Sequence, residues 1–109
     1  MFSLDLKMAH EDQFHSTHRL IKHGDVIAMR HALEGGLDPN LTNRSGWTLL
    51  MLAALHGRSD FVQLLVSAGA DPARKNKCGD SASSLAAHKG FAHLSSALEH
   101  ASVPHRTEV

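Results

Sequence analysis

Residues 43–75 read NRSGWTLLMLAALHGRSDFVQLLVSAGADPARK, and this stretch sets the pattern for the whole chain. A short apolar segment follows Thr48, and Gly57 ends it. A second apolar segment has helical spacing, and Gly69 ends it just before an Asp-Pro turn. The stretch therefore predicts two short helices, which cannot bury their apolar faces without neighbouring copies.

The same pattern recurs on both sides of this stretch, at a spacing of 33 residues. The matched positions are Gly46 with Gly79, Ala53-Ala54 with Ala86-Ala87, Gly57 with Gly90 and with Gly24, and Asp71-Pro72 with Asp38-Pro39. A single offset that aligns Gly, Ala-Ala and Asp-Pro indicates an internal repeat.

With this period the sequence resembles the ankyrin-repeat family, whose repeats are about 33 residues long. The resemblance covers about residues 10–101 and implies an all-α solenoid of three helix–turn–helix repeats joined by projecting β-turn loops. The expected repeats are about 10–42, 43–75 and 76–101, between an N-terminal arm (1–9) and a polar C-terminal tail (102–109). The middle copy departs from the family at Leu49-Leu50-Met51, where Pro-Leu-His is usual.

The spacing of apolar residues changes between the N-terminal arm and the first repeat. Apolar residues alternate with polar ones from Phe2 to Met8, which predicts an extended segment, either packed on the first repeat or free to pair with a partner. Helical spacing begins at Glu11 and continues to His23. Asp25 is a candidate N-cap for a second helix over residues 26–34.

Composition limits the possible functions. The 109 residues include 11 basic and 11 acidic side chains, and this balance argues against general nucleic-acid binding. The single cysteine, Cys78, suits a reducing compartment, and the sequence shows neither a membrane-length apolar run nor a signal peptide. We expect an intracellular protein, cytoplasmic or nuclear, that is monomeric, needs no cofactor and binds neither membrane nor nucleic acid.

The family resemblance implies that a partner binds at the turn tips and near the ends of the first helices. The matching residues are Lys22 and His23 in the first repeat, Arg44, Ser45, Trp47, Leu55 and His56 in the second, and Lys77, Cys78, Asp80, His88 and Lys89 in the third. Trp and Arg are enriched at binding hot spots, although Trp47 could also be a structural aromatic packed over the next turn. We expect a non-enzymatic interaction module whose preformed concave groove binds an acidic, apolar protein segment.

The ten histidines suggest an alternative, a metal-binding or pH-responsive protein. Glu11, His15 and His18 are spaced by four and three residues, so one helix face could present all three to a metal ion. His23 and His56 lie one repeat apart and are expected to be stacked neighbours. Catalytic motifs are absent, and Cys78 with His88 lacks the third group that a thiol enzyme needs.

Overall fold

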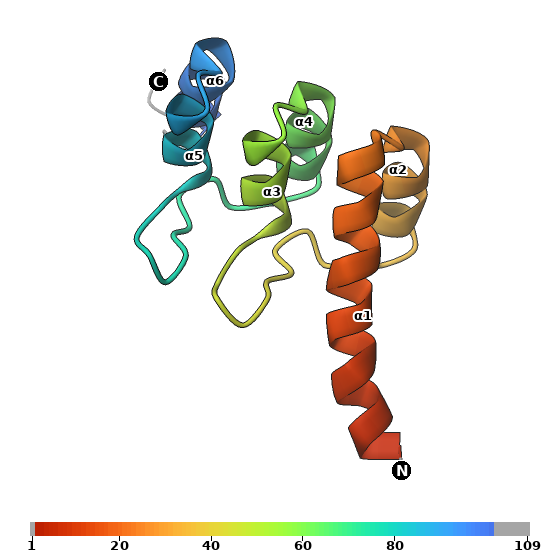
Figure 1. Cartoon of the computed structure of the whole chain (residues 1–109). Helices are drawn as coiled ribbons and strands as arrows, with labels where there is room; N and C mark the ends of the chain where they lie inside the picture. Colours follow the sequence, from red (N-terminus) through yellow and green to blue (C-terminus); the bar gives the residue numbers. More distant parts are fainter. Residues whose placement is uncertain (1, 102–109) are drawn as a thin grey trace, which may run out of the picture.

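The computed structural model describes the backbone of residues 2–101 and the side chains of residues 13–101. Six helices in this range stack as three pairs (Figure 1): α1 (Phe2–His23), α2 (Val26–Glu34), α3 (Leu49–Leu55), α4 (Ser59–Ser67), α5 (Ala82–His88) and α6 (Ala92–Ala101). The all-α solenoid of three repeats is confirmed. The expected tail, residues 102–109, lies outside the described residues.

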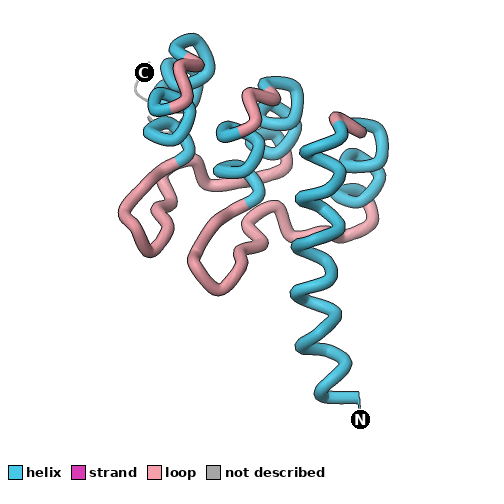
Figure 2. The backbone as a smooth tube through the Cα atoms, in the orientation of Figure 1, coloured by secondary structure: helices cyan, strands magenta, loops and turns pink. Residues whose placement is uncertain are grey.

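The helices form two layers, with α1, α3 and α5 in one and α2, α4 and α6 in the other (Figure 1). Long loops project from the base of the stack before α3 and before α5, as the pink segments of Figure 2 show. An isolated antiparallel bridge closes each loop, Thr42 with Thr48 and Lys75 with Ser81. Within residues 2–101 the chain forms no longer ladder, so the loops are held mainly by turns and side chains.

Hydroxyl side chains cap the N-termini of α3 and α5. The hydroxyl of Thr48 accepts the backbone N–H of Met51 at 3.1 Å and so caps α3. The N–H of Thr48 in turn donates to the sulfur of Met51 at 3.4 Å. Met51 stands where the family usually has His, and its sulfur supplies an acceptor at this place. Ser81 and Ser84 form the corresponding capping box at α5.

The core runs through the middle repeat. Every residue of α3 from Leu49 to Ala54 is buried, because α1 lies on one side of α3 and α5 on the other. The side chains of Ala53 and Ala54 are completely covered, and their small size allows the neighbouring helices to approach closely. The first repeat contributes Phe14 and Ile21, which confirms the helical face predicted for α1.

The prediction of an extended segment at residues 2–8 is wrong, because α1 begins at Phe2. Alternating apolar residues also place apolar side chains four positions apart, as at Phe2 and Leu6, so a short alternation fits a helix as well as a strand. No Gly or Pro interrupts the chain before Gly24, and the helix that packs on the repeats therefore continues toward the N-terminus.

The residues that directly follow Gly57 and Gly90 reach back over the preceding repeat. The guanidinium of Arg58 lies over Gly24, and the ring of Phe91 lies over Gly57. Arg58 and Phe91 are 33 residues apart, so both carry out the same structural task with different chemistry. These contacts tie each repeat to the one before it.

Candidate functional site

The residues expected to bind a partner lie on two levels of the layer formed by α1, α3 and α5 (Figure 1). The loop level carries Arg44, Ser45, Trp47, Lys77, Cys78 and Asp80, and the helix-end level carries Lys22, His23, Leu55, His56, His88 and Lys89. Because α3 has 7 residues, the two levels of the middle repeat are separated by about 10 Å along the helix axis.

An asparagine side chain fixes the shape of each projecting loop. The Oδ1 atom of Asn43 accepts the backbone N–H groups of Ser45 and Trp47, both at 3.0 Å. Asn76 does the same for Cys78 at 2.9 Å and Asp80 at 3.0 Å. The loop tips are therefore preformed, and a partner that binds them spends little free energy on ordering the backbone.

The two loops also contact each other. The backbone N–H of Lys77 donates to the carbonyl oxygen of Ser45 at 3.0 Å. At Gly46, an added Cβ would lie only 3.2 Å from the Cα of Asn76, so the glycine allows the backbones to pack directly. This contact sets the predicted loop residues of the second and third repeats side by side.

Trp47 is half-buried and packs against the hydrophobic core, whereas Arg44 beside it is exposed. The two interpretations of Trp47 are thus not exclusive, because part of the ring supports the loop and part faces solvent. Leu55, at the end of α3, is half-buried in the same manner. The middle repeat presents apolar surface at both levels, next to an exposed cation.

The helix-end level contains a pair of histidines that joins the first two repeats. The Nε2 atoms of His18 and His56 lie 3.4 Å apart. Their ring centroids are 5.5 Å apart and the ring planes are inclined by 40°. His18 comes from α1, and His56 is the C-cap residue of α3.

The predicted stacking of His23 on His56 is wrong, since His18 occupies that place. His23 and His56 are equivalent by sequence, yet the side chain that meets His56 comes from more than one turn earlier in α1. A repeat offset identifies equivalent positions, and it does not identify contacts between repeats.

Basic groups surround the histidine pair. The pKa of His18 is below its ordinary value, first because of burial and then because His56 lies beside it. Lys22 and His15 lower the pKa of His18 further.

Positively charged side chains also act on His56. Its pKa is also lowered, by burial first and then by the positive charges of Arg58, Lys22 and Lys89. Among residues 13–101, whose side chains the structure describes, the charged groups that act on either imidazole are basic. These groups come from all three repeats, so basic side chains gather at the helix-end level.

Arg58 is an interface residue that inspection of the sequence missed. Its Nε atom donates to the carbonyl oxygen of Ile21 at 3.1 Å, and its Nη2 atom donates to that of Lys22 at 2.8 Å. These carbonyls belong to the last turn of α1, where acceptors lack helical partners. The sequence contains one indication of this role, because the 33-residue offset places Arg58 at the position equivalent to Phe91.

The metal and thiol alternatives have less structural support. Among the residues that the structure describes, no group of three His, Cys, Asp or Glu side chains is placed to hold a metal ion. The side chain of Glu11 lies outside that set, so its predicted metal site with His15 and His18 is untested. Cys78 is exposed in a loop, whereas His88 lies at the far end of α5.

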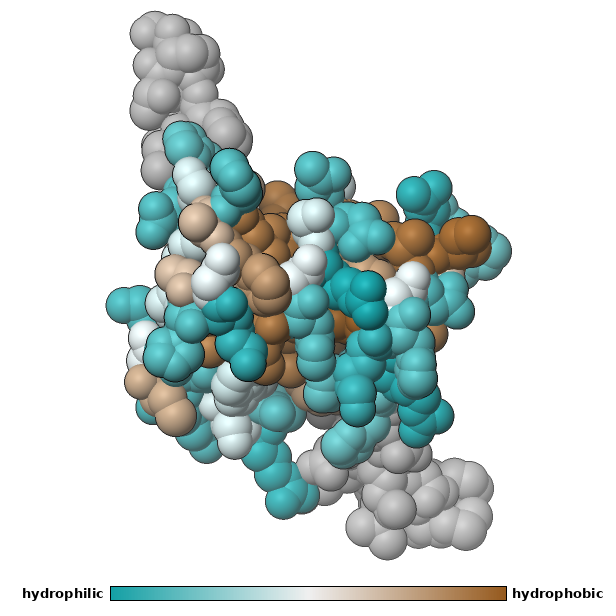
Figure 3. Space-filling view, turned by 45° about the horizontal axis from the view of Figure 1, so that its top comes forward, coloured by the Kyte–Doolittle hydropathy of each residue, from teal (hydrophilic) through white to brown (hydrophobic). Residues whose placement is uncertain are grey.

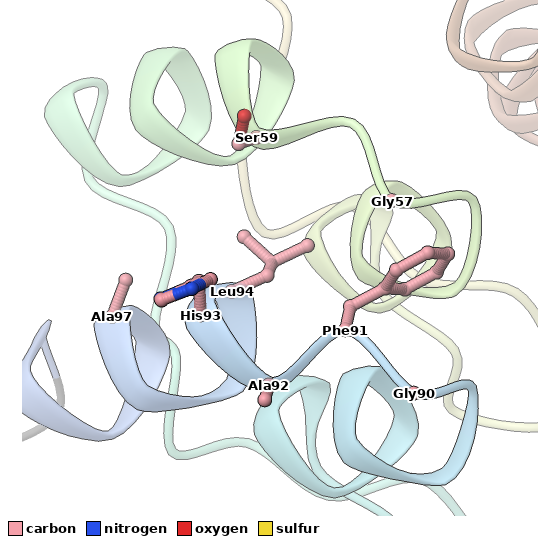
Figure 4. Close-up of a pocket in the computed structure, with 8 residues that line it drawn as sticks. All are labelled: Gly57, Ser59, Gly90, Phe91, Ala92, His93, Leu94 and Ala97. Carbon is pink, nitrogen blue, oxygen red and sulfur yellow. The ribbon is translucent and has the colours of Figure 1, made fainter.

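A separate apolar pocket lies between the second and third repeats (Figure 4). It has a volume of about 390 Å³ and is lined by Gly57, Ser59, Gly90, Phe91, Ala92, His93, Leu94 and Ala97. Phe91 closes one side, with its ring against Gly57. The view in Figure 3 shows further apolar surface in bands between polar side chains. In the described part of the chain, no helix is long and apolar enough to cross a membrane.

The geometry defines a class of protein, a short helical-repeat solenoid with preformed loops. Comparison with known families agrees, because the family model of ankyrin repeats (three copies) matches residues 17–103. The chain belongs to the ankyrin-repeat family, whose repeats act as protein–protein interaction modules.

Several curated proteins are similar to this chain over part of its length. Ankyrin repeat family A protein 2 of Homo sapiens is 38% identical over 76 residues, which are 70% of this chain and 24% of that protein. The 2-5A-dependent ribonuclease of Mus musculus is 44% identical over 62 residues, 56% of this chain and 8% of the relative. M-phase phosphoprotein 8 of Homo sapiens is 40% identical over 73 residues, 65% of this chain and 8% of that protein. The chain thus spans less than a quarter of each relative.

Proposed function

We propose that this chain is a non-enzymatic module that binds an acidic, partly apolar protein segment on the surface formed by α1, α3, α5 and the two loops. The observation that carries the proposal is the helix-end level, where the described charged groups that act on His18 and His56 are basic. Trp47 and Leu55 supply half-buried apolar surface on the same layer. A segment with acidic and apolar side chains would satisfy both kinds of surface.

The loop level adds preorganisation to this chemistry. Asn43 and Asn76 fix the loop backbones through side-chain hydrogen bonds. The backbone that carries Arg44 and Trp47 is therefore already ordered when a partner binds. Rigid presentation reduces the entropic cost of association. Trp47 is proposed to be the central contact, because a partly exposed indole beside an Arg is a common binding hot spot.

Affinity capture with mass spectrometry would recover partners, and isothermal titration would test the site with the partner obtained. Trp47→Ala is expected to weaken binding about tenfold or more, which corresponds to about 1.4 kcal/mol. Ile27→Ala is the matched control, since Ile27 is 68% exposed on α2, in the other helix layer. Unchanged affinity for Trp47→Ala, or equal losses for both variants, would contradict the proposed site.

Zinc binding separates this function from the metal-binding alternative. A ligand that binds only the folded state raises its melting temperature. We expect added zinc to leave the melting temperature unchanged, because the basic groups Lys22, Arg58 and Lys89 near the histidine pair disfavour a dication. A clear rise that His18→Gln abolishes would instead support a histidine metal site.

Location and assembly complete the proposal. The exposed free thiol of Cys78 fits a reducing compartment, and we propose an intracellular location, cytoplasmic or nuclear. We also propose that the module binds as a monomer. Imaging of a fluorescent fusion and light scattering of the purified chain test these two statements.

A further inference from the structure

The contact between His18 and His56 limits how many protons the pair can hold. At an Nε2–Nε2 distance of 3.4 Å, one ring donates an N–H and the other accepts with a lone pair. A proton added to the accepting Nε2 atom would turn it into a second donor, and would place two N–H groups and a positive charge against each other. In the free protein the pair therefore disfavours this further proton.

Among the side chains that the structure describes, the charged groups around the pair are basic. His15 and Lys22 of α1 act on the pair from one side, Arg58 acts from the turn after α3, and Lys89 acts from the C-cap of α5. Arg58 is held in place by its hydrogen bonds to the end of α1. Within residues 13–101 no acidic side chain is among the groups that lower the pKa of either imidazole or offset the basic ones, so a negative charge from a partner would complement this set.

We propose that His18 and His56 together form a receptor for a carboxylate of the partner segment, and that binding of this carboxylate takes up a proton. The inference rests on the proposed function, because the receptor lies on the same surface. A carboxylate placed at the two Nε2 atoms accepts one N–H from each ring. Its negative charge offsets the repulsion that disfavours the further proton at the accepting Nε2 atom, and this proton comes from bulk water.

The proton uptake fixes the sign of the pH dependence. If binding takes up about one proton, affinity rises by up to about tenfold for each pH unit by which the pH falls. This rise is confined to the range where the free pair is mostly neutral and the bound pair is charged, near the ordinary histidine pKa of about 6.5. Below that range both states are protonated and affinity no longer changes.

A synthetic peptide of alternating Glu and Leu is a suitable probe, because its carboxylates stay ionised above about pH 5.5. Isothermal titration at pH 6.5 in two buffers with different heats of ionisation gives the number of protons taken up. The wild-type protein is expected to take up between about half and one proton per bound peptide. His18→Gln and His56→Gln should each remove most of this uptake, whereas His31→Gln, on α2 in the other helix layer, should retain it.

Proton NMR titration of the wild-type protein provides a second measurement that needs no variant. With peptide bound, the titration midpoints of His18 and His56 should move to higher pH. Binding without proton uptake, uptake that persists in His56→Gln, or unmoved midpoints would each overturn the carboxylate receptor. Those results leave the proposed function intact if Trp47→Ala still weakens binding, whereas loss of the Trp47 effect contradicts the proposed function itself.

Discussion

The contact between Gly57 and Phe91 allows a quantitative test of how the repeats are joined. Gly57 has a φ of 69°, in the left-handed region that favours glycine. A Cβ atom added there would lie 2.8 Å from Cζ of Phe91, closer than a carbon pair tolerates. Gly57→Ala therefore combines backbone strain with a clash against the next repeat (Figure 4). Gly90 is the matched control, since it has a φ of 88° and no heavy atom within 4 Å of an added Cβ.

The cost can be estimated from these two contributions. An alanine in the left-handed region costs about 1–2 kcal/mol, and this part is common to Gly57→Ala and Gly90→Ala. Phe91 is 37% exposed, so its ring can move outward, but it then loses part of a burial worth about 1.5–3 kcal/mol when complete. We expect Gly57→Ala to cost about 2–4 kcal/mol and Gly90→Ala about 1–2 kcal/mol.

Chemical and thermal unfolding of five proteins tests this estimate: the wild type, Gly57→Ala, Gly90→Ala, Phe91→Ala and the double variant of Gly57→Ala with Phe91→Ala. If the ring is what the new methyl group meets, Gly57→Ala should cost no more in the Phe91→Ala background than Gly90→Ala costs in the wild type. For a domain of about 100 residues, each 1 kcal/mol corresponds to a melting shift of about 4–8 °C. An equal cost of Gly57→Ala in the wild-type and Phe91→Ala backgrounds would refute the argument that the ring of Phe91 packs on Gly57 and joins the second and third repeats.

Three further predictions follow from named contacts. Arg58→Met keeps an unbranched apolar stem but removes two hydrogen bonds to the end of α1, and we expect a loss of about 1–3 kcal/mol in urea unfolding. Asn40→Ala removes the amide that donates to Gly69 at 3.2 Å and accepts from Asp71 at 2.8 Å, and should cost about 1–2 kcal/mol by the same measurement. Because the folded-state pKa of His56 lies below 6.5, the unfolded chain binds more protons there, so stability is present above pH 6.5 and is lost as the pH falls through that value. Melting from pH 7.5 to 5.5 should show a weaker loss for His56→Gln than for the wild type, and an identical loss would contradict the pairing.

Much of the fold could be predicted because residues that start and end helices recur at equivalent positions of successive repeats. Gly24 and Gly57 end the first helices of their repeats, Thr48 caps α3, and Asp25 caps α2, all as their local chemistry indicates. Such features depend on the backbone within a few residues of each position. The 33-residue offset then assembles these local elements into a solenoid.

The arm at the N-terminus shows where local pattern is ambiguous. Four apolar residues in alternation fit a strand and also fit a helix, and only the continuity with the packed part of α1 distinguishes the two. A similar ambiguity holds for Trp47, which a loop position alone could leave exposed or buried. Packing against the core makes it half-buried.

The sequence by itself determined the number of repeats and the ends of most helices, and the family resemblance implied the layer on which we propose that a partner binds. Only the tertiary structure decided which side chains meet across repeats: His18 rather than His23 lies beside His56, and Arg58 caps the end of α1. The physical reason is that helix starts and stops are set by hydrogen bonds between near neighbours in the chain. Contacts between repeats depend instead on how far each side chain tilts and how one helix is displaced against the next, and a sequence offset does not contain that information.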